Sequence, residues 1–215
     1  MGNGTIANGN TASRFDLNGY APMPELIPTS LSSFLYEYAL KSAAQEKWQG
    51  DDAFTNTPCT SGDPLMDTLL ELLLPRVEAE SSRQLFPTYS YLRVYKRGDR
   101  LKRHSDRPSC EISLTLNLGY QADEPWPIWV ESNGAPRSCA LNPGDAMLYK
   151  GIELPHWRDP FQGENCAQVF LHYVDQKGPY AEWKFDKRDS LSASPPIQKL
   201  LLQLIDGAPA AVRSL

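Results

Sequence analysis

The chain has 215 residues, of which 41% are hydrophobic, and this is enough to bury one core but does not suggest several domains. Its formal net charge of −5, without a long basic run, argues against a nucleic-acid-binding surface. No segment approaches the roughly 20 apolar residues of a membrane span, and the N-terminus lacks a secretory signal pattern, so a cytoplasmic protein is expected. Four scattered cysteines without C-x-x-C spacing are expected to be reduced, buried thiols: Cys59, Cys110, Cys139 and Cys166.

The N-terminal part of the chain predicts a tail and then a helix. Residues 1–14 are rich in Gly, Asn, Thr and Ala, and they have too few apolar side chains to order themselves. Residues 15–215 are expected to form a single domain. Thr29 and Ser30 are suitable N-cap residues, and apolar residues then repeat at helical spacing as far as about Trp48.

A second helix is predicted after a loop. Residues 50–64 are dense in Asp, Thr, Pro and Gly, which predicts a loop. Asp63 and Pro64 then open a helix with a broad leucine-rich face, which Pro75 is expected to kink or interrupt. Both helices are expected to buttress one outer face of a sheet.

The rest of the chain predicts strands and one more helix. Short apolar or alternating runs, separated by Gly, Pro, Asp and Asn, indicate a barrel or sandwich. A final amphipathic helix is predicted over about 195–206. The fold class is therefore mainly β with flanking helices (α+β), and its strands are expected at 89–95, 112–118, 128–130, 146–149 and 167–174.

The tripeptide His104-Ser105-Asp106 and the later His156 match the spacing of a 2-His-1-carboxylate metal site. Residues i and i+2 of a strand point the same way, so His104 and Asp106 are expected to face one ion. Two imidazoles and a carboxylate suit Fe(II), and they leave one face of the ion open for a co-substrate and O₂. The three residues are therefore the candidate catalytic and metal-binding residues.

Four blocks around these residues recur in a known order. Residues 95–106 follow a Y-x-x-G-x-x-(Y)-x-x-H-x-D pattern, and 112–118 form a strand similar to one that ends in Y-L-N. Residues 141–149 contain Pro and Gly before an apolar stretch, and 156–174 contain His, Pro and Gly before a last strand. Over about 85–176 the chain thereby resembles the prolyl-4-hydroxylase-like branch of the Fe(II)- and 2-oxoglutarate-dependent dioxygenases.

This resemblance implies a double-stranded β-helix, or jelly roll, over about 85–176, buttressed by the N-terminal helices. It implies Fe(II), 2-oxoglutarate and O₂ as cofactor and co-substrates, with ascorbate as a candidate reductant. The implied reaction hydroxylates a C–H bond of a peptidyl residue or an amino-acid-like small molecule, with succinate and CO₂ as co-products and prolyl hydroxylation as the leading case. The expected partner is therefore a small-molecule or peptide substrate, with no nucleic acid or membrane. The sequence predicts no oligomeric state.

His172 is the alternative second metal histidine. No Pro- and Gly-containing turn with a following apolar strand leads into it, whereas Asn142-Pro143-Gly144 stands in that relation to His156. A buried, hydrogen-bonded histidine beside the site is the competing interpretation of His172.

The co-substrate pocket departs from the family pattern. The family places an Arg or Lys nine or ten residues after the second metal histidine, where this chain has Asn165 and Cys166, and two expected tyrosines are Leu101 and Thr115. A buried carboxylate needs another partner, because its burial without one is costly. The candidates are Arg158 first, since it lies two residues after His156, then Arg93, with Gln168 as an amide donor. The resemblance adds Tyr95 and Asn117 to the expected co-substrate contacts.

Two local features suggest a substrate entrance. Basic residues surround the H-x-D tripeptide, and they either attract an anionic ligand or only solvate a loop: Lys96, Arg97, Arg100, Lys102, Arg103 and Arg107. Trp126, Trp129 and Trp157 either clamp a substrate or pack in the core.

Two other classes of protein stay open from the sequence. A non-catalytic jelly-roll binding module is one, because the expected Arg or Lys is missing. A cupin-type metalloenzyme that does not use 2-oxoglutarate is the other.

Overall fold

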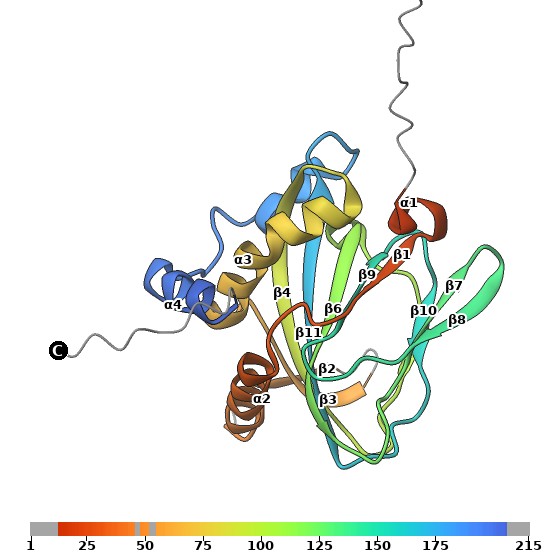
Figure 1. Ribbon diagram of the computed structural model, residues 1–215, viewed down its shortest axis with the longest axis vertical. Helices are drawn as coiled ribbons and strands as arrows, with labels where there is room; N and C mark the ends of the chain where they lie inside the picture. The colour runs from red at the N-terminus through yellow and green to blue at the C-terminus, as the bar shows by residue number, and fades with distance from the viewer. Residues whose placement is uncertain (1–12, 46–47, 52–54, 206–215) are drawn as a thin grey trace, which may run out of the picture.

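Two antiparallel sheets and a set of helices make up the fold in the computed structural model, which describes residues 13–45, 48–51 and 55–205 (Figure 1). The helices are α1 (Arg14–Asn18), α2 (Thr29–Ala43), α3 (Pro64–Ser81) and α4 (Pro195–Ile205), with short 3₁₀ segments η1 (Pro108–Cys110) and η2 (Ala181–Lys187). The strands are β1 (Tyr20–Met23), β2 (Gln49–Asp51), β3 (Thr55–Ser61), β4 (Leu85–Lys96), β5 (Leu101–His104), β6 (Ile112–Gln121), β7 (Ile128–Ser132), β8 (Ala135–Cys139), β9 (Ala146–Lys150), β10 (His156–Arg158) and β11 (Asn165–Asp175).

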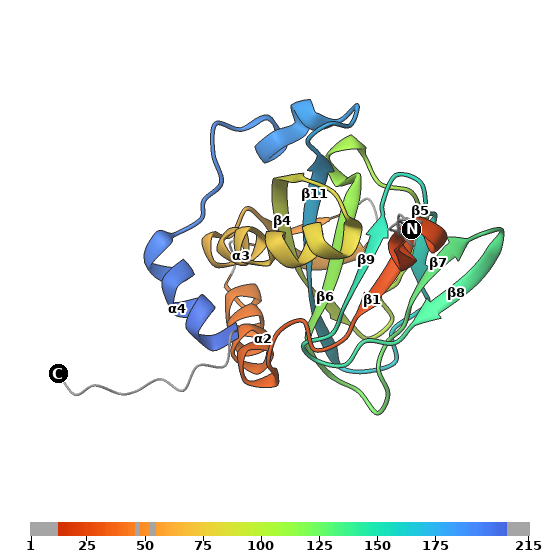
Figure 2. The same cartoon turned by 45° about the horizontal axis from the view of Figure 1, so that its top comes forward.

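The two sheets face each other as in a jelly roll. The larger sheet has the order β1-β9-β6-β11-β4-β3-β2, and the smaller has the order β5-β10-β7-β8. Helices α2, α3 and α4 lie on the side of the larger sheet that faces away from the smaller one, as Figures 1 and 2 show together. The long strands β4, β6 and β11 form the centre of the larger sheet.

Alternation along these central strands separates an apolar layer from a polar one. Residues such as Leu92, Leu116 and Val169 belong to the main hydrophobic core, which also contains Leu35 of α2 and Leu70 of α3. The intervening residues of the same strands point to the opposite face, because side chains alternate along a strand. That face, which lies between the two sheets, carries most of the polar residues discussed below.

Local chemistry explains the long helix. Asp63 caps α3, since its carboxylate accepts hydrogen bonds from the backbone N–H groups of Leu65 and Met66, and Pro64 occupies the first turn. The expected interruption at Pro75 is wrong, because α3 continues to Ser81. A proline removes one helical hydrogen bond, and the apolar face of α3 packs against the sheet strongly enough to keep the helix intact.

Other predictions need correction at the N-terminal side. The predicted loop over 50–64 contains part of β2 and all of β3, and Cys59, Thr60 and Ser61 pair with Arg93, Leu92 and Tyr91 of β4. Strand β2 forms the edge of the larger sheet and β3 lies next to it, and both are held by backbone pairing that residue composition does not reveal. Helix α2 ends at Ala43, before the expected residue 48, and residues 46–47 lie outside the described residues.

The predicted ends of the chain agree in part. Residues 1–12 of the predicted tail lie outside the described residues, while Ser13 caps α1 and Arg14 begins it. The C-terminal helix is α4, which begins at residue 195 as expected. Among the helices that the structure describes, none combines the length and apolar character of a membrane span.

Candidate metal centre and its cavity

A cavity of about 370 Å³ opens between the two sheets. Strand β4 contributes Tyr89, Tyr91, Arg93 and Tyr95, which are alternate residues and therefore share one face of the strand. The other lining residues come from both sheets and the loop after β5: Leu101, His104, Ser105, Asp106, Arg107, Cys110, Tyr149, His156, Phe170 and His172.

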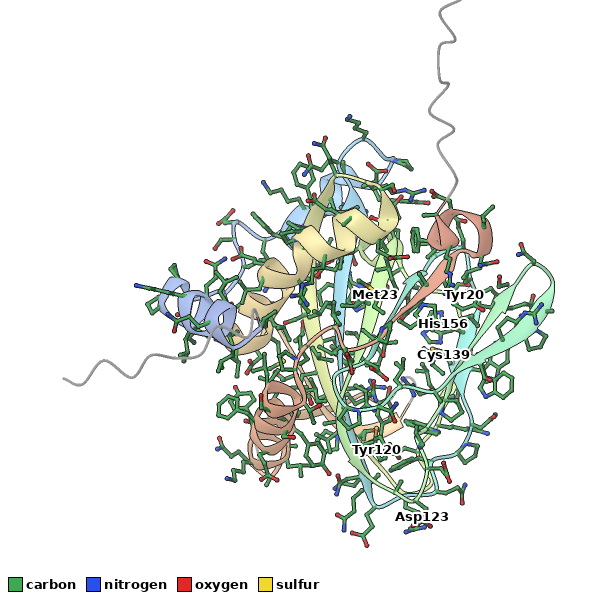
Figure 3. All side chains as sticks on the ribbon, in the orientation of Figure 1. Tyr20, Met23, Tyr120, Asp123, Cys139 and His156 are labelled. Atoms are coloured by element: carbon green, nitrogen blue, oxygen red, sulfur yellow. The ribbon has the colours of Figure 1, made fainter. Side chains whose placement is uncertain are left out.

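His104, Asp106 and His156 meet in this cavity, as their spacing predicts. The Nε2 atoms of His104 and His156 each lie 3.5 Å from Asp106 Oδ1. His104 ends β5 and pairs directly with His156 at the start of β10, where Figure 3 labels His156. Asp106, however, lies beyond the end of β5, so the expected geometry of a continuous strand is wrong for it. Its backbone N–H instead donates to the carbonyl of Gly151, at 2.9 Å.

The hydrogen bonds of the two imidazoles leave one nitrogen of each ring for a metal. His104 Nδ1 lies 2.8 Å from the carbonyl oxygen of Lys102, and His156 Nδ1 lies 2.9 Å from that of Leu154. A carbonyl only accepts, so each Nδ1 carries a proton, and each Nε2, which faces Asp106, is the nitrogen left for a metal. Such bonds fix both the tautomer and the ring orientation of metal-binding histidines.

Electrostatics also suits a cation. Burial favours a neutral Asp106, but hydrogen bonds with His104 and His156 outweigh it and hold the pKa of this carboxyl well below its usual range. Burial likewise opposes a charge on His104, but its bonds to Asp106 and to the Lys102 carbonyl raise its pKa. Asp106 is therefore ionised, and a metal cation at this site would replace the proton shared by these groups.

Ser113 and His172 form a hydrogen-bonded chain that holds the Asp106 carboxylate. The Ser113 hydroxyl donates to Asp106 Oδ2 at 3.1 Å, and His172 Nδ1 lies 2.9 Å from Ser113 Oγ. Burial lowers the pKa of His172 to about 4, so the ring is neutral near pH 7. Because the serine has one proton, we assign the Nδ1 proton to His172 as donor to Ser113.

A second group within the described residues, Asp106 with Cys110 and His172, also has donor atoms within 4.8 Å of one another. It suits a metal less well, because it offers one imidazole and a thiol in place of two imidazoles. Burial also raises the pKa of the Cys110 thiol to about 12, which keeps it protonated. The geometry therefore favours His156 over His172 as the second imidazole ligand.

Arg158, the first candidate for the carboxylate of 2-oxoglutarate, is 1% exposed and does not line the cavity. Its Nη1 donates to the carbonyl of Trp126 at 2.6 Å, and its Nη2 lies 3.5 Å from Thr115 Oγ1 and 3.4 Å from Gln168 Oε1. Within the described part of the chain, Nε has no hydrogen-bond partner and no carboxylate forms an ion pair with this arginine. Burial lowers the pKa of Arg158, as expected for a cation without an anion.

The other candidate contacts are placed differently. Arg93 lines the cavity, donates from Nη2 to Tyr91 Oη at 2.8 Å, and lies over the rings of Tyr91 and Tyr95. Tyr95 is fully buried and also lines the cavity. Asn117 does not line it; its side chain donates to the Leu141 carbonyl and accepts from the Gly119 backbone N–H. Asn117 thus has a structural use that the sequence did not suggest.

The predicted entrance residues are only partly at the cavity. Of the basic rim, Arg107 is the member that lines it. Trp126 packs against Tyr95 and Phe161 in a small core, and Trp129 stacks on Trp157 with ring centroids 6.1 Å apart. None of the three tryptophans lines the cavity. The aromatic lining comes instead from Tyr89, Tyr91, Tyr95, Tyr149 and Phe170. The sequence signal that could have identified them is their alternation with core residues along the strands.

Comparison with known proteins shows the fold but no sequence family. No family model and no curated protein matches the chain. A Pseudomonas putida prolyl-4-hydroxylase is 15% identical with a TM-score of 0.61, covering 75% of this chain and 95% of that one. EctD from S. alaskensis, solved with bound Fe, is 15% identical with a TM-score of 0.62, covering 89% and 91%.

The epimerase SnoN, solved with Fe³⁺, alpha ketoglutarate and nogalamycin RO, is 13% identical with a TM-score of 0.62, covering 75% of this chain and 81% of that one. The structural neighbours thus include prolyl hydroxylases and a non-heme epimerase that depends on alpha ketoglutarate. The predicted double-stranded β-helix is confirmed.

The support of Asp106 by Ser113 predicts a measurable effect on metal affinity. Ser113→Ala should weaken Mn(II) or Fe(II) binding by about 10- to 100-fold, because the carboxylate loses the hydroxyl that orients it. Calorimetric titration under anaerobic conditions measures this change. Ser81→Ala is the matched control, since it removes another buried hydroxyl, bonded to the Val77 carbonyl of α3, far from the cavity. Equal affinities in the two variants would contradict this role of Ser113.

Proposed function

We propose that this protein is an Fe(II)- and 2-oxoglutarate-dependent oxygenase that hydroxylates a C–H bond of a peptidyl residue or an amino-acid-like small molecule. The observation that carries the proposal is the convergence of two Nε2 atoms on one carboxylate oxygen inside the cavity of a double-stranded β-helix. This donor set suits Fe(II), and it would occupy one face of the ion and leave the other face open. Succinate and CO₂ are the expected co-products, and ascorbate is a candidate reductant.

The metal and its co-substrates would supply the oxidising power, while the chain holds, orients and encloses them. His104, Asp106 and His156 would hold the ion, and Ser113 with His172 would keep the Asp106 carboxylate in one orientation. Tyr149, which is buried and packs edge-on against His156 at 4.7 Å, restricts that ring and excludes water on one side. The aromatic walls of the cavity would keep the reacting groups out of bulk solvent.

Arg158 would pair with the distal carboxylate of 2-oxoglutarate. A fully buried guanidinium without a carboxylate partner is costly, and a bound dicarboxylate would supply the missing anion. The neighbours of Arg158 support this assignment, since Thr115 and Gln168 offer further hydrogen bonds at the same place. Because Arg158 does not line the cavity, its side chain or the residues beside it would have to move for this pairing.

The proposal defines the substrate less narrowly than the type of reaction. A prolyl-4-hydroxylase and a prolyl hydroxylase in complex with a peptide fragment, from Trichoplax adhaerens, are among the structural neighbours, so a prolyl residue is the first substrate to test. The other neighbours include an epimerase and a carbocyclase, and the fold alone does not determine a substrate. A cytoplasmic location belongs to this proposal as an expectation from the sequence.

The metal ligands can be tested one by one. His104→Ala, Asp106→Ala and His156→Ala should each abolish Fe(II) binding and succinate formation, because each removes a ligand, while circular dichroism shows a folded protein. His172→Ala is the control and should still bind Fe(II). If His156→Ala instead keeps its Fe(II) affinity and His172→Ala loses it, His172 is the second ligand.

The role of Arg158 predicts a specific kinetic change. Arg158→Ala should raise the KM for 2-oxoglutarate about 10- to 150-fold, since a charge-assisted hydrogen bond lost from a buried site costs roughly 1.5–3 kcal/mol. Arg158→Lys should recover only part of this, because a point charge does not replace a planar fork. Fe(II) affinity should stay unchanged in both variants. A normal KM in Arg158→Ala with a large increase in Arg93→Ala would assign the role to Arg93.

A further inference from the structure

Arg107 follows the proposed metal ligand Asp106 directly and lines the cavity. Its guanidinium lies over the ring of Tyr89, 4.7 Å from the ring centroid, and Tyr89 in turn packs against His172 at 4.6 Å. With a side chain that is 46% exposed, Arg107 lies at the rim of the cavity, unlike the buried Arg158. A cation thus stands at the open side of the cavity, close to the proposed metal centre.

A carboxylate from a distant part of the chain, that of Asp186, forms an ion pair with this guanidinium. Arg107 Nη1 lies 2.8 Å from Asp186 Oδ1, and Nη2 lies 2.9 Å from Oδ2. Two parallel bonds of this kind are the geometry with which an arginine recognises a planar carboxylate. Asp186 comes from η2, which is remote from Arg107 in the sequence.

The segment that carries Asp186 has a strained backbone and no fully buried side chain. Phe185, Asp186 and Lys187 are consecutive non-glycine residues with φ of 53°, 54° and 61°, in the left-handed region that side chains disfavour. None of the residues of η2 is buried. Hydrogen bonds of Arg188 to the carbonyls of Phe185 and Thr88 anchor its C-terminal end. Such strain persists only where other contacts hold the backbone, and it is typical of functional segments.

We propose that Arg107 is the binding site for a carboxylate of the substrate, and that Asp186 occupies this site until the substrate arrives. The substrate class is then a small molecule, or a chain terminus, with a carboxylate near the C–H bond to be oxidised. Its carboxylate would bind at the rim, and its apolar part would lie between Tyr89, Tyr91 and Phe170 in the cavity. Release of Asp186 would let the strained segment relax. This inference rests on the proposed oxygenase function, because the metal centre defines the reacting end of the cavity.

Two features indicate that the carboxylate bound by Arg107 belongs to the substrate and not to 2-oxoglutarate. Arg158 offers a fully buried cation away from the rim, as a co-substrate bound beneath the substrate requires. Arg107 is accessible from solvent, and its partner can leave without exposing any buried side chain of η2.

The test uses acetate as the probe and acetamide as its neutral counterpart. Asp186→Gly removes the internal carboxylate and also suits the positive φ, so the fold should be kept. Acetate should saturably raise the melting temperature of Asp186→Gly, with an apparent Kd at least about ten times lower than for the unaltered protein. Acetamide should have no effect. The double variant Asp186→Gly/Arg107→Gln should lose the acetate response. If Asp186→Gly does not fold, Asp186→Asn replaces it and should show the same acetate response.

A second readout locates the acetate. In the Mn(II)-loaded Asp186→Gly protein, the methyl proton resonance of acetate should broaden, because the bound anion lies near the metal centre. Failure of Mn(II) to bind would contradict the proposed function, while the acetate response of the metal-free protein still decides the carboxylate site. Acetate binding that is no tighter in Asp186→Gly than in the unaltered protein would overturn the inference and leave a structural ion pair. Acetate that binds without Mn(II)-dependent broadening, or a tenfold weaker 2-oxoglutarate affinity in Arg107→Gln, would overturn it too.

Discussion

The structure depends on one constraint, which is that two imidazole rings must turn their Nε2 atoms toward the same carboxylate oxygen. Backbone carbonyls of Lys102 and Leu154 satisfy this constraint, because each accepts the Nδ1 proton of the histidine two residues further on. The pairing of β5 with β10 then brings the rings together, with centroids 4.3 Å apart. Asp106 completes the group through its loop, its backbone bond to Gly151 and its bond from Ser113.

The larger sheet stabilises the fold enough to allow such a polar centre inside a small protein. One face of β4, β6 and β11 packs with α2 and α3 in the main hydrophobic core, which contains most of the buried hydrophobic residues. The opposite face can therefore carry buried polar groups such as Ser113, Gln168 and His172, each of which has a hydrogen-bond partner. Arg158 differs from these groups, because it has hydrogen-bond partners but its positive charge has no anionic partner among the described residues.

The sequence predicted the parts of the site that depend on short-range pattern. His104, Asp106 and His156 were recognisable because the H-x-D tripeptide, the later histidine and the blocks around them resemble a known metal-binding pattern. Strands β4, β6, β7, β9 and β11 followed from the pattern of apolar residues. Strands β1, β2, β3, β5, β8 and β10 were not predicted, because short strands and strands at or next to a sheet edge are defined by their pairing partners. The Ser113–His172 support and the Arg107–Asp186 pair join residues 59 and 79 positions apart, and no local pattern reveals contacts of that kind.

An anaerobic titration of the unaltered protein with Fe(II) and 2-oxoglutarate tests the central claim most directly. The account predicts a weak visible charge-transfer band that requires both components together and disappears in His156→Ala. Fe(II) binding without such a band would contradict the use of 2-oxoglutarate and would favour a cupin-type metalloenzyme. No Fe(II) binding at all would contradict the metal centre itself and leave a non-catalytic jelly-roll module.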